Sequence, residues 1–363
     1  MAFCFECCLA PIRSSARPAI RRSLSTMRMS AEGTKKLVFL GSPTFAADSL
    51  KKLNSASKAM GYELSLVVTQ PPQPAGRKRT MTPTPVHAVA EELDIDVQTP
   101  AKASDPDFIE FLEKLEPDLC VTAAYGNFLP SKFLRIPRHG TINIHPSLLP
   151  LFRGAAPVPR ALEAGVETTG VTIVFTVLEM DAGPIISQRE VTLKGDEKSH
   201  ELLDSLFDIG TDEVLNVIPS IFDATVEPVE QDHSKATHAD KMRKEEGVTA
   251  FTENAVRIHN KIRAFAGWPG VWAEFISETA KGVREELRIK LITSRVHEAE
   301  GGPALGVHEI NLGACKDALR VVCDDGSVLD ILELQPQGKK PMPAKQFKGS
   351  LQGKTFSRKR VPH

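Results

Sequence analysis

The sequence predicts an α/β protein in two parts, a mostly parallel sheet followed by a small β-rich barrel. Between residues 34 and 223, short apolar runs alternate with segments of helical spacing, the pattern of a parallel sheet with crossover helices. After Trp268-Pro269-Gly270, short strand-like runs are separated by glycine-containing turns, which favours a barrel over residues 251–363. The stretch between, residues 224–250, is polar and poorly periodic and is interpreted as an interdomain linker.

The bulk composition is that of an ordinary globular protein. The chain has 363 residues, enough for two domains, with 41% hydrophobic and 25% charged residues. Its net charge of -1 provides no general attraction to nucleic acid, so only local clusters of cations could bind one. No apolar run reaches the roughly 18 residues of a membrane span, and we expect no membrane partner.

The cysteines predict neither a disulfide framework nor a metal site. Three of the six lie near the N-terminus and the others are scattered. Cys4 and Cys7 form a CxxC motif, but no second ligand pair follows at the spacing of a zinc site. A reducing compartment fits this usage.

Residues 1–33 differ in composition from everything that follows. They contain five arginines and several serines, no lysine and only two acidic residues. A leader of this kind is typical of an organellar transit peptide, the alternative being a disordered tail. We expect the mitochondrion, while the apolar opening Ala2–Ala10 keeps the plastid open. The segment is excluded from the fold.

The first elements follow from apolar runs and helical spacing. Lys36–Gly41 predicts a buried strand and Phe45–Lys58 a helix. The turn between them has only the first glycine of G-x-G-x-x-G, which disfavours a dinucleotide site. The elements predicted next are the strand Tyr62–Gln70, the helix Val86–Leu93, a short strand near Val97, the helix Asp107–Leu115 and the strand Asp118–Gly126.

A basic segment interrupts this series. Proline and glycine density predicts an exposed loop over Pro71–Pro85. Three consecutive cations, Arg77, Lys78 and Arg79, lie at its centre. Such a cluster could contact phosphates or could simply be solvated.

The stretch Thr141–Pro150 carries the residues best suited to chemistry. Asn143 and His145 alternate with isoleucines, which in a strand puts both polar side chains on one face. A proline follows His145, so the pair lies at the carboxyl end of the strand, where open α/β sheets usually bind ligands. An amide beside an imidazole could polarise a carbonyl and handle a proton. The alternative is a polar strand end with a hydrogen-bonded histidine.

The remaining elements are predicted in the same way. An aspartate in a D-x-G turn, Asp181, would ordinarily cap its own backbone. The histidines of residues 224–250 are interpreted as solvated. The predicted ranges are helix Val158–Ala164, strand Gly170–Val177, turn Leu178–Pro184, strand Ile185–Leu193, helix Ser199–Phe222, helix Phe251–Phe265, and the strands Val271–Ile276, Leu287–Thr293, Leu319–Cys323 and Val328–Gln335.

The C-terminal residues Lys339–His363 contain eight Lys or Arg and no acid. A basic tail on a barrel suits contact with a nucleic-acid backbone, or it could equally be a solvated end.

Taken together, several motifs give the chain its resemblance to the methionyl-tRNA formyltransferases, a family of 10-formyltetrahydrofolate-dependent enzymes. The resemblance covers roughly residues 35–356, and no single motif is decisive. The matching pieces are GSPTFA (41–46), PAGR (74–77), AAYG (123–126), INIHPSLLP (142–150), FRGAAP (152–157), GVTI (170–173), MDAGPI (180–185), WPG (268–270) and LQPQGKKPM (334–342).

The resemblance implies a Rossmann-like formyltransferase domain over residues 34–223 and an OB-like β-barrel that binds tRNA over residues 251–363. It implies a catalytic triad of Asn143, His145 and Asp181, a monomer, 10-formyltetrahydrofolate as co-substrate and initiator Met-tRNA as acceptor, without a metal. The residues implied to contact folate are Ser147, Leu148, Leu149, Pro150, Ala124, Tyr125 and Gly126. Those implied to contact tRNA are Arg77, Lys78, Arg79, Lys244, Lys339 and Lys340.

Three departures from the family pattern leave these chemical groups in place. Pro146 stands where the bacterial pattern usually has glycine, and the Asp181 turn is D-A-G instead of D-T-G. The segment before Arg77 lacks the acidic residue often found there.

The implied chemistry is attack of an amine on the formyl carbon. Asn143 and a protonated His145 would donate hydrogen bonds to the oxyanion that forms. Asp181 would orient His145, stabilise its cationic form and help to move the proton. Two alternatives stay open: the same core could hydrolyse 10-formyltetrahydrofolate or formylate a small amine, or the chain could be an RNA-binding module on an inactive scaffold.

Overall fold

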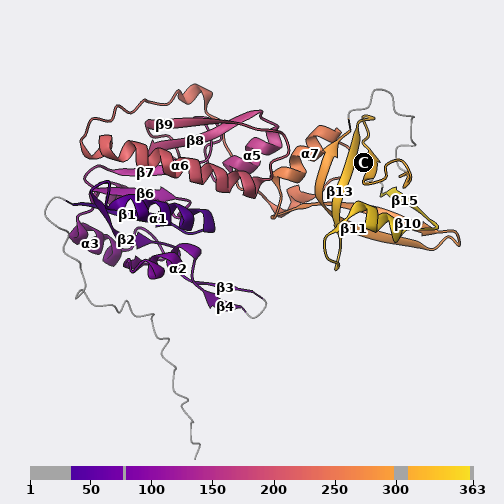
Figure 1. The fold of residues 1–363 in the computed structure, drawn as a ribbon, viewed down its shortest axis with the longest axis horizontal. Helices are drawn as coiled ribbons and strands as arrows, with labels where there is room; N and C mark the ends of the chain where they lie inside the picture. Colours follow the sequence, from indigo (N-terminus) through magenta and orange to yellow (C-terminus); the bar gives the residue numbers. More distant parts are fainter. Residues whose placement is uncertain (1–33, 77–78, 298–309, 360–363) are drawn as a thin grey trace, which may run out of the picture.

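The computed structural model of the protein describes residues 34–76, 79–297 and 310–359 (Figure 1). Within these ranges the chain forms a seven-stranded sheet, a six-stranded sheet and a two-stranded hairpin. The two larger sheets follow one another along the long axis of the molecule (Figure 1). The predicted class, an α/β sheet followed by a small β-rich unit, is confirmed.

The first sheet is mostly parallel, as predicted, with an antiparallel edge. Its strand order is β5-β2-β1-β6-β7-β8-β9. The pairs from β5 to β7 are parallel, whereas β7–β8 and β8–β9 are antiparallel. The strands are β1 (Lys35–Gly41), β2 (Tyr62–Val68), β5 (Val97–Gln98), β6 (Leu119–Ala123), β7 (Thr141–His145), β8 (Thr168–Phe175) and β9 (Ile185–Thr192).

Helices cover both faces of this sheet. The helices are α1 (Thr44–Ser57), α2 (Pro85–Glu92), α3 (Pro106–Leu115), α4 (Ser131–Leu134), α5 (Pro157–Ala164) and α6 (Ser199–Phe222). Apolar residues of α1, α2 and α6 share one core with the sheet, and those of α3 and α4 share another. The sequence did not predict α4, because a helix of four residues is too short to show periodicity.

The caps of α2 and α3 explain why these helices begin where they do. Thr84 Oγ1 accepts from the His87 amide at 3.1 Å, and Asp105 Oδ1 accepts from the Asp107 amide at 3.0 Å. A proline occupies the first position of each helix, where its missing N–H costs nothing.

The basic segment contains a short hairpin, where the sequence predicted an exposed loop. Strands β3 (Gln73–Ala75) and β4 (Thr80–Thr82) pair antiparallel and are fully exposed. The hairpin projects away from the first sheet (Figure 1). Strands of only three residues are too short to show an alternation of apolar and polar side chains, so the sequence pattern predicted only a loop.

The second sheet is antiparallel and curled into a half-barrel (Figure 1), which confirms the expected β-rich, OB-like unit. Its order is β12-β13-β11-β10-β15, with β14 beside β13. Its elements are α7 (Ala255–Ala264), β10 (Val271–Thr279), β11 (Arg284–Val296), β12 (Leu319–Val322), β13 (Val328–Pro336), β14 (Met342–Pro343), α8 (Ala344–Gly349) and β15 (Lys354–Arg358).

The helix predicted over Phe251–Phe265 begins later than expected. Asn254 caps α7 by accepting from the Arg257 amide at 2.8 Å. Phe251 precedes the cap with a φ of 61° and is buried, with its ring centroid 5.8 Å from that of Phe275. The apolar spacing therefore begins before the first residue of the helix, which is why the predicted start was too early.

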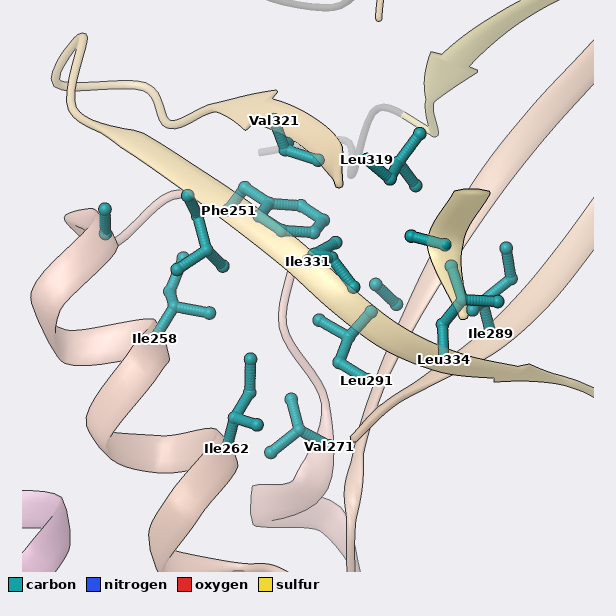
Figure 2. Close-up of a cluster of buried hydrophobic side chains, with 14 of the residues drawn as sticks. Phe251, Ile258, Ile262, Val271, Ile289, Leu291, Leu319, Val321, Ile331 and Leu334 are labelled. Carbon is teal, nitrogen blue, oxygen red and sulfur yellow. The ribbon is translucent and has the colours of Figure 1, made fainter. Parts of the chain in front are cut away.

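One apolar core spans both parts of the molecule. Around α7, Ile258 and Ile262 face strand residues such as Leu291 and Ile331 (Figure 2). The same cluster includes residues of α5 and α6, namely Val158, Leu162, Leu202 and Leu206. Removal of the C-terminal part would expose these side chains to water, so the two parts cannot be separated cleanly by truncation.

Helix α6 lies very close to β7 and β8. A methyl group added at Gly210 would lie 2.5 Å from Ile144 Cγ2 and 2.8 Å from Val171 Cγ2. Ile144 lies between Asn143 and His145 on β7. The glycine therefore lets the helix pack directly behind the strand that carries the polar pair.

We predict that Gly210→Ala destabilises the protein by about 1–3 kcal/mol, because the added methyl group overpacks this contact. Alanine alone would favour a helix by about 1 kcal/mol. Gly349→Ala in α8 is the matched control, since nothing lies within 4 Å of the added methyl group there, and it should be neutral or stabilising. Urea unfolding followed by circular dichroism measures both, and equal values would contradict the close packing of α6.

Candidate active site

The carboxyl ends of the parallel strands meet at one edge of the first sheet. Ser42 Oγ, just after β1, and Gln70 Nε2, just after β2, both donate to the Tyr125 carbonyl after β6, at 3.2 Å and 3.1 Å. β7 is the next strand beside β6, and its last residue is His145. The sequence-predicted site therefore lies at the edge where such sheets usually bind ligands.

The Asn143 side chain is held in one orientation. Thr122 Oγ1 on β6 donates to Asn143 Oδ1 at 2.7 Å. Asn143 is half-buried, and its Nδ2 makes no hydrogen bond to any residue that the structure describes. The amide is thus fixed with its N–H groups available to an acceptor.

His145 is buried, with 3% of its surface exposed. Its Nε2 lies 3.1 Å from the carbonyl oxygen of Phe152, which can only accept a hydrogen bond, so Nε2 carries a proton. Its Nδ1 lies 3.6 Å from Asp181 Oδ1, too far for a hydrogen bond. Nδ1 is therefore the ring nitrogen left for a substrate.

Asp181 does not cap its own turn, as an aspartate in D-x-G ordinarily would. Its Oδ2 accepts from the Gly154 amide at 2.8 Å, a contact between two loops. Asp181 has a φ of 53°, in the left-handed region that non-glycine residues rarely adopt. Two residues later, a Cβ on Gly183 would collide with the Phe175 carbonyl, so the turn requires glycine there.

The loop after β7 is fixed by internal hydrogen bonds. Ser147 Oγ donates to the Leu151 carbonyl at 2.6 Å, so this side chain is committed to the loop and not to a ligand. Thr172 Oγ1 on β8 donates to the Ser147 carbonyl at 2.7 Å and accepts from the Leu149 amide at 3.1 Å. Leu149 is buried, while Leu148 and Pro150 are half-buried.

The segment after β6 combines exposed and buried residues. Ala124 and Gly126 are exposed and have φ values of 49° and 85°. Tyr125 between them is buried, and burial raises the pKa of its hydroxyl. Ala124 and Gly126 therefore present this segment to a ligand, while the Tyr125 side chain belongs to the core.

The predicted tRNA-binding cations occupy three separate places. Arg79 is exposed on the hairpin, and its neighbours Arg77 and Lys78 lie outside the described residues. Lys244 is exposed in the stretch between the two sheets, and Lys339 and Lys340 are exposed in the turn after β13. None of the described cations among them contacts His145 or Asp181.

The basic C-terminal residues are more structured and less free than the sequence suggested. They form β14, α8 and β15, and Arg358 is buried and paired with Asp324 at 2.8 Å. Lys359 Nζ lies 3.0 Å from Glu274 and 2.8 Å from Glu286. Acids from earlier parts of the C-terminal unit thus neutralise part of the charge that appeared unopposed in the sequence.

Two buried polar residues near the site were not singled out from the sequence. Arg153 in the FRGAAP loop is 4% exposed, and Gln231, in the stretch interpreted as a linker, is 5% exposed. That stretch packs against the loop, since the Arg153 amide donates to the Thr237 carbonyl at 2.9 Å and the Ala239 amide donates to the Arg153 carbonyl at 2.7 Å. Polar composition alone could not reveal this burial.

Two of the three thiols in the described part of the chain, those of Cys120 and Cys323, are buried and poorly suited to chemistry. Burial raises the pKa of Cys120, which lies on β6, and raises that of Cys323 to about 11. Among the described residues no cluster of His, Cys, Asp and Glu is placed to hold a metal ion. Over the same residues, no helix has the length and apolarity needed to span a membrane.

Comparisons with known proteins agree with this geometry. Residues 35–218 match the formyl transferase family, and residues 241–352 match the formyl transferase C-terminal domain. The chain is 39% identical over 326 residues to a methionyl-tRNA formyltransferase of Macrococcus caseolyticus, covering 89% of this chain and 99% of that one. It is 36% identical over 312 residues to a methionyl-tRNA formyltransferase of Bacillus cytotoxicus, covering 86% and 94%.

Solved structures share the fold at lower identity. An N-formyltransferase from Helicobacter canadensis, in complex with folinic acid and dTDP-3-aminofucose, has a TM-score of 0.59 at 17% identity, covering 82% of this chain and 99% of that one. A sugar 3N-formyl transferase has a TM-score of 0.58 at 14% identity, covering 85% and 99%. Identity over nearly the whole length of the bacterial relatives, in both the α/β part and the C-terminal sheet, shows that the chain belongs to the methionyl-tRNA formyltransferase family of formyl-transferring enzymes.

Proposed function

We propose that this enzyme transfers the formyl group of 10-formyltetrahydrofolate to the amino group of methionine on initiator Met-tRNA, as a monomer, for translation initiation in an organelle. The observation that carries the proposal is the convergence of Asn143, His145 and Asp181 at the carboxyl end of β7. The names of the bacterial relatives support the choice of acceptor.

Each of the three residues has a role that its contacts support. Asn143, with Oδ1 occupied by Thr122, donates from Nδ2 to the formyl oxygen. His145 donates from Nδ1 to the same oxygen, while Nε2 stays on the Phe152 carbonyl. Asp181 lies close enough to orient the imidazole and to help remove the proton of the attacking amine.

The folate is proposed to lie against residues 124–126 and the loop after β7. Both segments follow the carboxyl ends of strands in the first sheet, where such sheets usually bind ligands, and this supports the placement. Because Ser147 is bonded within its loop, backbone groups and the sides of Leu148 and Pro150 are left to make the contact.

We predict that Asn143→Ala, His145→Ala and Asp181→Asn each lower the single-turnover rate of formyl transfer, the loss of the Asn143 donor costing roughly a hundred- to a thousandfold. Thr141→Val is the matched control, since Thr141 lies on the same face of β7 but farther from its end, and it should keep most of the rate. Circular dichroism must show folded protein, and an unchanged rate in any triad variant would remove that residue from the mechanism.

The acceptor is tested in the same assay by running initiator Met-tRNA and a small amine in parallel. Formylated tRNA that disappears in His145→Ala supports the proposal. Release of formate, or formylation of the small amine alone, would point instead to a 10-formyltetrahydrofolate hydrolase or a small-amine formyltransferase with the same core.

The exposed cations are proposed to contact the phosphates of the tRNA. Arg79 on the hairpin, Lys244 between the sheets, and Lys339 and Lys340 after β13 are all exposed to solvent. Arg77 and Lys78, which precede Arg79 in the sequence, are proposed to act with it.

We predict that Arg79→Ala or Lys339→Ala weakens tRNA binding and lowers the slope of log Kd against log salt by about 1 for each phosphate that is no longer neutralised. Lys359→Ala is the matched control, because Glu274 and Glu286 already neutralise this cation, and the slope should stay unchanged. Filter binding over a range of salt concentrations measures the slope. Equal slopes for all three variants would refute the assignment of these cations.

The organellar setting is proposed from the composition of residues 1–33 alone, with the mitochondrion ahead of the plastid. We predict that these residues, fused to a fluorescent protein, direct it to mitochondria, and that replacing their five arginines by glutamine abolishes the import. Plastid fluorescence would favour the alternative, and diffuse fluorescence would exclude a transit peptide.

A further inference from the structure

The segment 229–239 lies across both loops that hold His145 and Asp181. At one end, Ile185 at the start of β9 and Val229 exchange backbone hydrogen bonds at 2.7 Å and 2.8 Å. At the other end, Thr237 Oγ1 accepts from the Phe152 amide at 2.8 Å. The segment is therefore fastened to the Asp181 side and to the Phe152 side of the site.

Gln231 lies between these two attachments with all its hydrogen-bonding capacity used. Its Nε2 donates to the carbonyls of Asp181 and Gly183, at 2.8 Å and 2.7 Å. Its Oε1 accepts from Arg153 Nε at 3.1 Å and Arg153 Nη2 at 2.6 Å. Only this orientation of the amide fits, because carbonyl oxygens need donors and a guanidinium needs an acceptor.

These contacts form a closed ring of residues that joins the Asp181 turn to the loop after β7. Gln231 holds the backbone of Asp181, and the Asp181 carboxylate accepts from the Gly154 amide at 2.8 Å. Gly154 follows Arg153 in the chain, and the Arg153 side chain returns to Gln231. Phe152, whose carbonyl oxygen lies 3.1 Å from His145 Nε2, immediately precedes Arg153 in the same loop.

The Asp181 turn needs an external support. Its φ of 53° is costly for a residue with a Cβ, so it persists only where surrounding contacts fix it. Gln231 donates to the carbonyl of Asp181 itself and to that of Gly183, two residues later; the first bond is partly buried and the second is buried, where water cannot replace it.

We propose that Gln231 is a positioning residue for formyl transfer, which acts through Asp181 by holding the turn that places its carboxylate beside His145. This inference rests on the proposed roles of Asp181 and His145. Gln231 touches neither ring nitrogen of His145, so it is not itself a catalytic residue.

The test uses Gln231→Glu and Gln231→Met in the full chain. Glutamate keeps an acceptor for Arg153 but loses both donors to the turn, and methionine loses both functions without adding charge. For each variant we expect kcat to fall by roughly a hundredfold, as for a small misplacement of a catalytic group. KM for 10-formyltetrahydrofolate and for Met-tRNA should stay within about twofold, because KM unchanged with kcat lowered marks an interaction used only in the transition state.

A double-variant cycle separates positioning from general destabilisation. If Gln231 acts through Asp181, adding Gln231→Glu to Asp181→Asn should cause little further loss in single-turnover rate. Independent, multiplicative losses would overturn the proposal. His233→Ala is the matched control, since exposed His233 contacts the same Arg153 at 3.1 Å but not the turn, and it should keep most of the rate.

The outcomes separate this inference from the proposed function. If the wild-type enzyme formylates Met-tRNA and folded Gln231→Glu does so at the same rate, Gln231 has no positioning role while the function stands. If the wild type releases only formate, the acceptor is wrong, and the same cycle on formate release still tests Gln231. Should glutamate prevent folding, Gln231→Met is measured in its place, and its kcat decides in the same way.

Discussion

The hydrogen bond from the Gly154 amide to the Asp181 carboxylate is the contact on which the site depends. It joins the loop after β7 to the turn after β8, two segments that the sequence places far apart. Once they are joined, His145 has the Phe152 carbonyl at one ring nitrogen and Asp181 near the other. The half-buried Asp181 carboxylate is held by this bond near the imidazole, so the strained turn fixes the geometry proposed for catalysis.

The rest of the molecule keeps β7 and the C-terminal sheet in fixed positions relative to this contact. Gly210 lets α6 lie directly behind Ile144. Nearer its N-terminus, α6 contributes Leu202 and Leu206 to the apolar core that it shares with the strands of the second sheet. The site and the C-terminal sheet are therefore parts of one packed body. An acceptor that contacted both would meet surfaces whose separation is set by apolar packing, not by a flexible connection.

Much of the fold and of the proposed site was predictable from local pattern. Buried strands such as β1 and β6 are continuous apolar runs, and α2 and α3 carry their caps in the sequence. The alternation around Asn143 placed two polar side chains on one face of β7. The hairpin β3–β4 and helix α4 were missed because elements of three or four residues carry no periodicity. The pairing of Arg358 with Asp324 and of Lys359 with Glu274 was not predictable, because these acids lie far from their partners in the sequence.

By itself, the sequence determined the strand-and-helix order, the polar pair on β7 and the chemical groups available for formyl transfer, because these depend on neighbours within a few residues. Only the tertiary structure decided that Asp181 reaches across to Gly154, that Arg153 and Gln231 are buried together, and that Ser147 is turned into its own loop. Such contacts join positions distant in the chain, and a polar residue shows no sign in its own neighbourhood of the partner that will bury it.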